Sequence, residues 1–200
     1  MKLYFTPNSP YARVARVALR ETGLIGQVTE LVATLRQPNN PVLEFSPVGR
    51  VPVLVTDDVV ITEVKLIYEY LAEVSGDVGL FSTASRDWRA AAQEGLILGF
   101  LEGIVAWVRE NRRDPPHRSA FLQEVEQARA GRCLSALNAA SESRSLPDVP
   151  CFRGTALASA LSLMDLHDCV PDWRANYQPL AKWFERQAER PSMKETAPRP

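Results

Sequence analysis

A proline opens an apolar, strand-like segment at Arg50-Val51-Pro52-Val53-Leu54. An Asp57-Asp58 turn follows, then a second apolar segment at Val59-Val60-Ile61. Proline normally demotes a strand, because it has no N–H to donate to the ladder. A cis Val51-Pro52 bond would instead kink the chain and leave the Val51 N–H and C=O facing outward, unpaired. We therefore predict an edge here that an extended, peptide-like ligand can join in strand fashion.

The helix expected just downstream, opening at Thr62-Glu63, suits the two ends of such a ligand. A helix N-terminus offers free N–H groups and the positive end of the helix dipole, which favour a carboxylate. The Glu63 carboxylate suits an ammonium group. Glutathione has a peptide middle, free carboxylates and a free amine, so it meets all three requirements.

The first part of the chain has the pattern of an α/β domain. Its expected elements are a strand at 2–5, a helix at 11–23, a strand at 28–32, an irregular segment or short helix at 34–49, a hairpin around Asp57-Asp58 and a helix at 63–74. Strand, helix and strand within about 30 residues indicate a βαβ unit with a parallel pair. The order βαβ, α, ββα predicts a thioredoxin-like domain over residues 1–76. In its last helix we place Leu66, Ile67, Tyr70 and Leu71 on one apolar face.

After an expected linker at 77–83, residues 84–200 show only helical periodicity. We expect an all-α bundle with helices at 85–113, 119–140, 151–164 and 177–189. The segment 151–164 is short and apolar, as a helix buried at the centre of a bundle would be. Trp88 is counted among the apolar positions of the first long helix, and Pro191 is expected to end the last one.

Bulk composition argues against several kinds of partner. The formal net charge of −1 over 200 residues gives no basic surplus for nucleic acid or an anionic membrane. No apolar run approaches the roughly 18 residues of a membrane span, and the chain enters a strand at once without a signal peptide, so we expect a cytoplasmic protein. The three cysteines are far apart with no C-x-x-C pair, so we expect no metal site.

Four motifs in order resemble the cytosolic glutathione transferase family. Residues 1–13 are similar to its first strand, active-site loop and first helix. Residues 45–54 (FSPVGRVPVL) are similar to its N-P-x-G-K-V-P-x-L motif, and residues 62–71 to T-E-S-x-x-I-x-x-Y-L. Residues 172–192 look like the C-terminal end of bacterial members. The resemblance spans nearly the whole chain and implies glutathione as co-substrate.

Ser9 is the candidate catalytic residue that the resemblance implies, because in this fold the residue between the first strand and first helix meets the ligand sulfur. Related thiol-disulfide proteins carry C-P-Y-C where this chain has Ser9-Pro10-Tyr11-Ala12, so mixed-disulfide chemistry from this position is excluded. A hydroxyl remains that can donate a hydrogen bond to a thiolate. Serine is also a favoured helix N-cap, and both roles can hold together.

The resemblance also implies a set of glutathione-binding residues. The backbone of Val51 with Pro52 would take the cysteinyl unit, and Glu63 the amine. Arg36, Gln37 or Arg50 would contact the glycyl carboxylate. The alternatives are that cis-proline only shapes the fold, that Glu63 stabilises the helix dipole, and that the three polar side chains are solvated.

Val64 departs from the family, which usually has serine here to hold the γ-glutamyl carboxylate. Valine keeps the backbone N–H and loses the hydroxyl. A lost hydrogen bond to a charged group costs about 1.5–3 kcal/mol, which predicts roughly 10- to 150-fold weaker glutathione binding unless another donor compensates. A second departure is the missing Ser/Thr-x-x-Asp capping box near residues 151–154.

The electrophile pocket of the family is bordered by the first long helix of the second domain. Trp107, Arg109 and Arg113 lie late on that helix, and Tyr11 is assigned to the same pocket, although a tryptophan at helical spacing is more often core. Apolar faces of the first two long helices can also serve a homodimer seam. The sequence thus predicts a glutathione transferase acting on small apolar electrophiles. The alternative is a non-catalytic protein of the same fold, while a glutathione-dependent reductase or dehalogenase would lack its cysteine.

Overall fold

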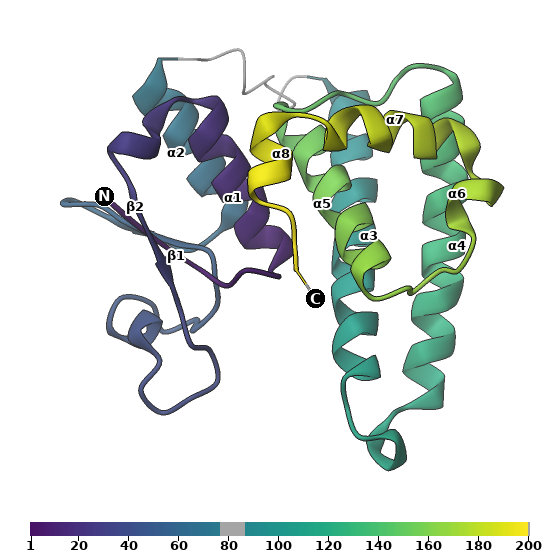
Figure 1. The fold of residues 1–200 in the computed structure, drawn as a ribbon, viewed down its shortest axis with the longest axis horizontal. Helices are drawn as coiled ribbons and strands as arrows, with labels where there is room; N and C mark the ends of the chain where they lie inside the picture. The colour runs from purple at the N-terminus through teal and green to yellow at the C-terminus, as the bar shows by residue number, and fades with distance from the viewer. Residues whose placement is uncertain (77–86, 200) are drawn as a thin grey trace.

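A mixed four-stranded sheet with helices makes up the first part of the chain (Figure 1). The computed structural model describes residues 1–76 and 87–199. The elements of this first part are β1 (Lys2–Phe5), α1 (Pro10–Glu21), η1 (Leu24–Gly26), β2 (Thr29–Val32), η2 (Pro41–Glu44), β3 (Val53–Val55), β4 (Val60–Ile61) and α2 (Val64–Ser75). This is the thioredoxin-like order that the sequence predicts.

The strands lie in the order β2-β1-β3-β4. β1 runs parallel to β2 with Lys2 opposite Thr29, and antiparallel to β3 with Tyr4 opposite Val53. β3 and β4 form the expected antiparallel hairpin. β1 lies between β2 and β3, and its C-terminal end is next to the start of the antiparallel β3. The loop that follows β1 therefore begins beside the start of β3. This topology brings the Ser9 loop close to the Val51-Pro52 segment.

The second part is mostly helical. Its elements are α3 (Trp88–Asn111), η4 (Pro115–His117), α4 (Ala120–Glu142), α5 (Phe152–Leu166), α6 (Trp173–Asn176), α7 (Gln178–Ala188) and α8 (Pro191–Glu195). α5 lies at the centre and packs against α1, α3 and α7, and twelve of its residues are buried. The expectation of a central buried helix is confirmed. α5 also starts without a side-chain cap, since Cys151 makes no capping hydrogen bond.

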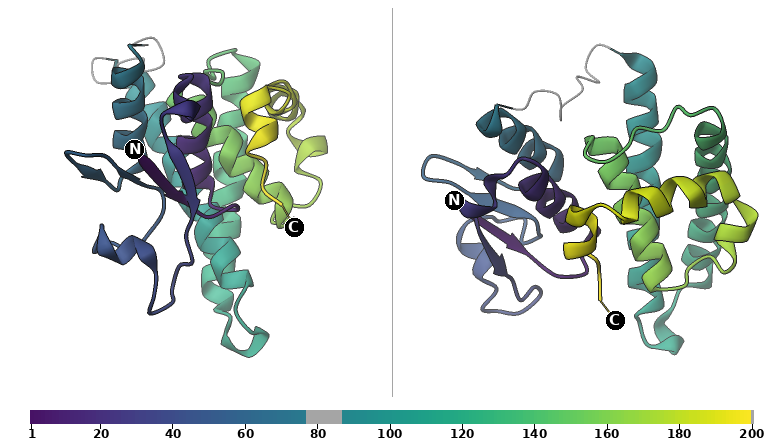
Figure 2. Two further views of the ribbon diagram at one scale, coloured as in Figure 1. Left: turned by 60° about the vertical axis from the view of Figure 1, so that its left-hand side comes forward. Right: turned by 45° about the horizontal axis from the view of Figure 1, so that its top comes forward.

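The two parts share one large hydrophobic core. α1 packs on α2 on one side and on α5 on the other, so it lies between the sheet and the helical part (Figure 2). The ring of Tyr68 on α2 meets the ring of Phe152 on α5 edge-on, with 5.5 Å between centroids. Burial of such aromatic pairs ties the two halves of the molecule together.

Three expectations about local structure are wrong. Trp88 is 85% exposed and Leu66 51% exposed. Leu66 is out of phase because the core face of α2 carries Val64, Ile67, Tyr68, Leu71 and Ala72, at the spacing i, i+3, i+4, i+7. Pro191 opens α8 at its first position instead of ending α7, because the fixed φ of proline and its missing N–H suit a helix start.

α3 is long and apolar enough to meet the composition test for a membrane span, with a mean hydropathy of 1.4 in its most apolar window. Some 44% of that window is buried inside the protein, where α3 packs against α4 and α5. A core helix of a water-soluble protein passes the same test, so α3 is weak evidence for a membrane. The expected linker at 77–83 lies outside the described residues.

Candidate functional site

Ser9 caps α1 and keeps a hydrogen to donate. The loop turns tightly, with the Ser9 N–H donating to the Thr6 carbonyl at 3.1 Å. The Ser9 Oγ accepts from the Ala12 N–H at 3.2 Å, and Pro10 follows at the first helical position. An accepting hydroxyl still has its own hydrogen free for another acceptor. Ser9 therefore is an N-cap, and the same geometry leaves it able to donate to an anion.

Val51 and Pro52 precede β3 and are joined by a cis peptide bond, which is the condition for the edge expected from the sequence. The first ladder residue of β3 is Val53, which pairs with Tyr4, so neither Val51 nor Pro52 has a partner residue in the described register. Both are buried, and the neighbouring Tyr4 packs against Phe45 in a small core cluster. The Val51 backbone thus lies beside the sheet without belonging to its pairing.

Glu63 and Val64 form the start of α2. Glu63 is the N-cap, and its Oε1 accepts from the Lys65 N–H at 3.4 Å. Val64 is the first helical residue and is 4% exposed, with its methyl groups in the main core cluster. The Glu63 carboxylate is exposed, so capping leaves it within reach of a cation. At Val64 the first helical turn offers backbone N–H groups and an apolar side chain.

Arg109 on α3 and Arg50 before β3 interact electrostatically with Tyr11, and Arg36 interacts with Arg109. Burial lowers the pKa of Arg109 on α3, and repulsion from Arg36 and Arg50 lowers this pKa further. Burial also raises the pKa of the Tyr11 hydroxyl above 10.0, and the Glu102 carboxylate adds to this rise. Among the described residues, none of the three arginines forms an ion pair within 4.0 Å. Tyr11, Arg109, Arg50 and Arg36, here called the Tyr11 cluster, thus lie near two carboxylates as well, those of Glu102 and Glu63.

The loop that carries Arg36 has an unusual backbone. Arg36 adopts a left-handed conformation with φ of 60°, which costs a non-glycine residue free energy. Arg36, Gln37 and Arg50 are all exposed in the segment between β2 and β3. The structure thus brings Arg36 and Arg50 near Arg109, a meeting that the sequence pattern does not reveal because α3 lies in the helical part.

Trp107 and Arg113 are placed differently. The Trp107 side chain is 8% exposed and belongs to the main hydrophobic core, so it does not line an open pocket. It lies on the inner face of α3, in step with Ile104 and Phe100. Arg113 lies beyond the last residue of α3 and faces Glu110, with 3.8 Å between Nη1 and Oε2. Of the three residues proposed on this helix, only Arg109 joins the Tyr11 cluster.

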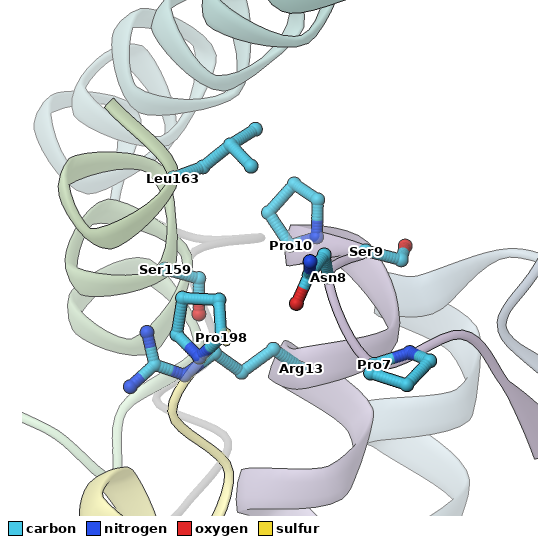
Figure 3. A pocket seen from close by; sticks show the side chains of 8 residues that line it. All are labelled: Pro7, Asn8, Ser9, Pro10, Arg13, Ser159, Leu163 and Pro198. Carbon is cyan, nitrogen blue, oxygen red and sulfur yellow. The ribbon is translucent and has the colours of Figure 1, made fainter. Parts of the chain in front are cut away.

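Sequence reasoning missed the residues that lie behind the Ser9 loop. A pocket there is lined by Pro7, Asn8, Ser9, Pro10, Arg13, Ser159, Leu163 and Pro198 (Figure 3). Arg13 carries a charge and yet is only 4% exposed, and it stands in the otherwise apolar run Ala12 to Ala15. An arginine within a run of apolar helix residues is the sequence signal that could have indicated a buried charge here. The contacts of Asn8 with the C-terminal residues had no signal, because they join segments far apart in the sequence.

Comparisons with known proteins find glutathione transferases similar to this chain. Residues 3–77 match the model of the glutathione S-transferase N-terminal domain. The chain is 26% identical over 202 residues to the uncharacterized GST-like protein YibF of Escherichia coli strain K12, covering 99% of this chain and 98% of that protein. Residues 3–77 of this chain therefore carry the pattern of a glutathione S-transferase N-terminal domain. The matched region contains Ser9, Pro52 and Glu63, whereas Arg109 lies outside it.

Solved structures of bacterial glutathione transferases superpose on nearly the whole of this chain. A glutathione S-transferase from Methylobacillus flagellatus KT, with glutathione bound, has a TM-score of 0.88 and 26% identity and covers 99% of both chains. A family member from Pseudomonas fluorescens Pf-5, with bound glutathione, has a TM-score of 0.86 and 26% identity over 100% of this chain and 99% of that one. The thioredoxin-like domain and the helical part therefore both have the fold of these glutathione transferases.

Proposed function

We propose that the protein is a serine-type glutathione transferase in which Ser9 stabilises the thiolate of glutathione. The observation that carries this is the Ser9 Oγ, which accepts from the Ala12 N–H at the α1 N-terminus and so directs its own hydrogen elsewhere. A hydrogen bond from Ser9, together with the helix dipole, lowers the thiol pKa from roughly 8.5 towards neutrality. The thiol proton passes to solvent, and the thiolate attacks an electrophilic carbon to form a C–S bond. In a substitution the bond to the leaving group breaks and the leaving group departs with its electron pair; in an addition the electron pair displaced from the attacked double bond takes up a proton from water.

In the proposed complex, glutathione lies along the edge formed by Val51. The Val51 backbone pairs with the cysteinyl unit in strand fashion, and the exposed Glu63 carboxylate receives the amine. Arg36, Gln37 or Arg50 binds the glycyl carboxylate, which is supported by the absence of an ion-pair partner for Arg36 and Arg50 among the described residues. The γ-glutamyl carboxylate accepts from the Val64 N–H at the start of α2.

The proposed electrophile pocket lies beside Tyr11 and Arg109. These two groups interact electrostatically across the space between α1 and α3. Trp107 contributes from the core behind it rather than as a wall of the pocket, and Arg113 lies farther along the chain. The proposed co-substrate is a small apolar electrophile, and detoxification is the corresponding role.

We also propose a division into a domain at 1–76, a linker at 77–83 and a helical domain at 84–200, and a cytoplasmic homodimer. Support for a dimer comes from large apolar side chains exposed on the first two long helices, Trp88 on α3 and Phe121 on α4. Neither nucleic acid nor a membrane is a proposed partner. Size-exclusion chromatography with light scattering should give twice the monomer mass of 22.3 kDa.

A non-catalytic glutathione-transferase-like protein is the second candidate, and Val64 is the observation that favours it. Its side chain is buried in the core and supplies no hydroxyl to the carboxylate. Such a protein would keep the fold and show millimolar or no affinity for glutathione. Calorimetric titration of glutathione into the wild type separates the two candidates, because an enzyme of this class should bind it in the micromolar to sub-millimolar range.

The proposed catalytic role is tested by Ser9→Ala, with Ser9→Thr as the matched control that keeps the hydroxyl. Turnover of glutathione with several classes of electrophile should exceed the uncatalysed rate. Loss of a hydrogen bond to a charged sulfur should lower kcat by about 10- to 150-fold, while the Kd of glutathione stays within about threefold. Ser9→Thr should retain most of the activity. Absence of wild-type turnover with every class, or full activity in Ser9→Ala, would exclude the proposal.

A further inference from the structure

Asn8, the residue before Ser9, is hydrogen-bonded to the far end of the chain. The Asn8 Nδ2 donates to the Arg199 carbonyl at 2.7 Å, and the Arg199 N–H donates to the Asn8 Oδ1 at 2.9 Å. The Asn8 side-chain amide thus pairs with both the N–H and the C=O of Arg199, as the backbone of a neighbouring strand would. The two residues are 191 positions apart, so only the folded chain brings them together.

Residues 190–199, here called the C-terminal strap, are hydrogen-bonded to α1 near its N-terminal end. The buried Arg13 donates from Nη2 to the Met193 carbonyl at 2.8 Å and from Nε to the Thr196 Oγ1 at 3.4 Å. Thr196 is itself buried, and its hydroxyl donates to the Ser192 carbonyl at 2.7 Å. These bonds set the path of the strap from α8 towards the Ser9 loop.

The same strap is fastened to the C-terminal end of α1 by ion pairs. Arg190 forms two hydrogen bonds with Glu21, at 2.7 and 3.1 Å, and Arg20 pairs with Glu195 at 2.9 Å. The strap therefore follows α1 along its length and reaches Asn8 at the helix N-terminus (Figure 1). Paired and partly buried groups of this kind hold a segment in one position better than isolated surface pairs do.

The Ser9 loop has weaker support from the helical part behind it. The pocket under the loop brings together two buried polar atoms without a hydrogen-bond partner, the Arg13 Nη1 and the Ser159 Oγ. Figure 3 shows Pro198 of the strap lying beside Ser159 and Arg13, while the Ser9 hydroxyl points to the other side. Among the residues that the structure describes, α5 makes no hydrogen bond to Asn8 or Ser9. The loop is held from behind by the two hydrogen bonds between the Asn8 side chain and the Arg199 backbone of the strap.

We propose that Asn8 is a positioning residue for Ser9, and that the C-terminal strap holds it in place. The proposal rests on the proposed role of Ser9 in binding the thiolate. A hydrogen-bond donor must be held within about 0.5 Å of its productive position. Because Asn8 is joined to Ser9 by one peptide bond, fixing its side chain against Arg199 restricts the backbone that carries Ser9, and with it the position of the Ser9 Oγ.

Asn8→Ala tests the proposal, since it removes both bonds to Arg199 and leaves Ser9 unchanged. Asn176→Ala is the control, because Asn176 is exposed on α6 and far from the loop. A chain truncated after Pro198 removes the same bonds from the other side. Three quantities are measured: the pKa of the bound glutathione thiol from thiolate absorbance, kcat with an electrophile, and the Kd of glutathione.

We expect Asn8→Ala to raise the pKa of the bound thiol and to lower kcat about tenfold, since a misplacement of about 1 Å can cost up to 10²-fold. The Kd should change less than about twofold. The truncated chain should behave in the same way, and the two changes combined should cost no more than either alone. Asn176→Ala should match the wild type.

Two failures are distinguishable. A wild type that neither lowers the thiol pKa nor turns over would overturn the proposed function and the positioning role together. If the wild type lowers the pKa of the bound thiol, and Asn8→Ala has the same thiol pKa and kcat as Asn176→Ala, the positioning role alone is overturned. Amide hydrogen exchange of residues 6–12 provides a readout independent of activity. It should become faster in both Asn8→Ala and the truncated chain, and unchanged exchange in both would contradict the strap.

Discussion

At the residue scale, we expect Val64 to weaken the proposed glutathione site while leaving the fold intact. As the first residue of α2 it fills the core with two methyl groups, and its N–H remains at the open end of the helix. A serine here would add a hydroxyl for the ligand carboxylate and lose packing. At this position the chain therefore has a side chain that packs in the core, where the family it resembles usually has a serine that binds the ligand.

Replacing Val64 by threonine separates these two effects. Val64→Thr keeps one methyl group in the core and adds the missing hydroxyl. We expect glutathione to bind about 10- to 150-fold more tightly in calorimetry, from about 1.5–3 kcal/mol for a hydrogen bond to a charged group. Val60→Thr, on exposed β4, is the matched control and should leave the Kd unchanged. Unchanged affinity in Val64→Thr would show that another donor already serves the carboxylate.

Ser9 illustrates a residue whose two possible roles are compatible. Its lone pair caps α1 through the Ala12 N–H, and its hydrogen remains for a ligand. Capping alone is worth about 1 kcal/mol. A small loss of stability in Ser9→Ala is therefore expected in addition to the loss of kcat, and the threonine control accounts for it.

At the scale of elements, the start of α5 is held by close packing in place of a capping box. Cys151 gives no side-chain cap, whereas Gln187 on α7 bonds to the preceding loop. Its Nε2 donates to the Asp148 Oδ1 at 2.6 Å, and its Oε1 accepts from the Val149 N–H at 2.9 Å. The central helix is thus positioned by a neighbouring helix, not by its own first turn.

Gly154 is the position where this packing is tightest. A Cβ there would lie 2.6 Å from the Asp148 carbonyl and from the Pro147 oxygen, which are backbone atoms that cannot turn away. We expect Gly154→Ala to lower the free energy of unfolding by about 3 kcal/mol or more, measured by urea denaturation. Gly131→Ala on α4 is the control, because a Cβ added there would have no neighbouring heavy atom within 4 Å. That change should stabilise the protein by about 0.5–1 kcal/mol. Equal effects at both positions would contradict the close packing.

At the scale of the whole molecule, the C-terminal strap joins the last residues to the first helix. Glu21 on α1 receives hydrogen bonds from Arg190 and Ser192. Burial raises the pKa of Glu21, but the hydrogen bonds from these two residues and the charge of Arg190 lower it by more, so the net pKa falls below 4.5. The ionised form of Glu21 is therefore favoured in the folded state.

This lowered pKa predicts acid weakening of the strap. The stabilisation by Glu21 is complete above pH 4.5 and is lost as the pH falls through the lower pKa of the folded state. The difference in Tm between the wild type and Glu21→Gln should thus shrink as the pH falls below 4.5. Glu189→Gln, at an exposed pair with Lys194, is the control and should change Tm little at any pH. A constant difference between wild type and Glu21→Gln from pH 7 to pH 3 would contradict the assignment.

The sequence by itself determined what depends on neighbours along the chain. Turn and cap residues placed α1 after Ser9, the hairpin and the α2 start at Glu63. Apolar periodicity placed α3, α4, α5 and α7. These signals are local because caps, turns and amphipathic faces are formed by residues within a few positions of one another.

Only the tertiary structure decided which side chains meet across the molecule. It buried Trp107 and exposed Trp88 on the same helix, since the phase of α3 depends on its packing against α4 and α5. It brought Arg109 to Arg36 and Arg50, and Arg199 to Asn8. Such contacts carry no pattern in one sequence, because each is made by the packing of elements whose separation along the chain says nothing of their distance in space.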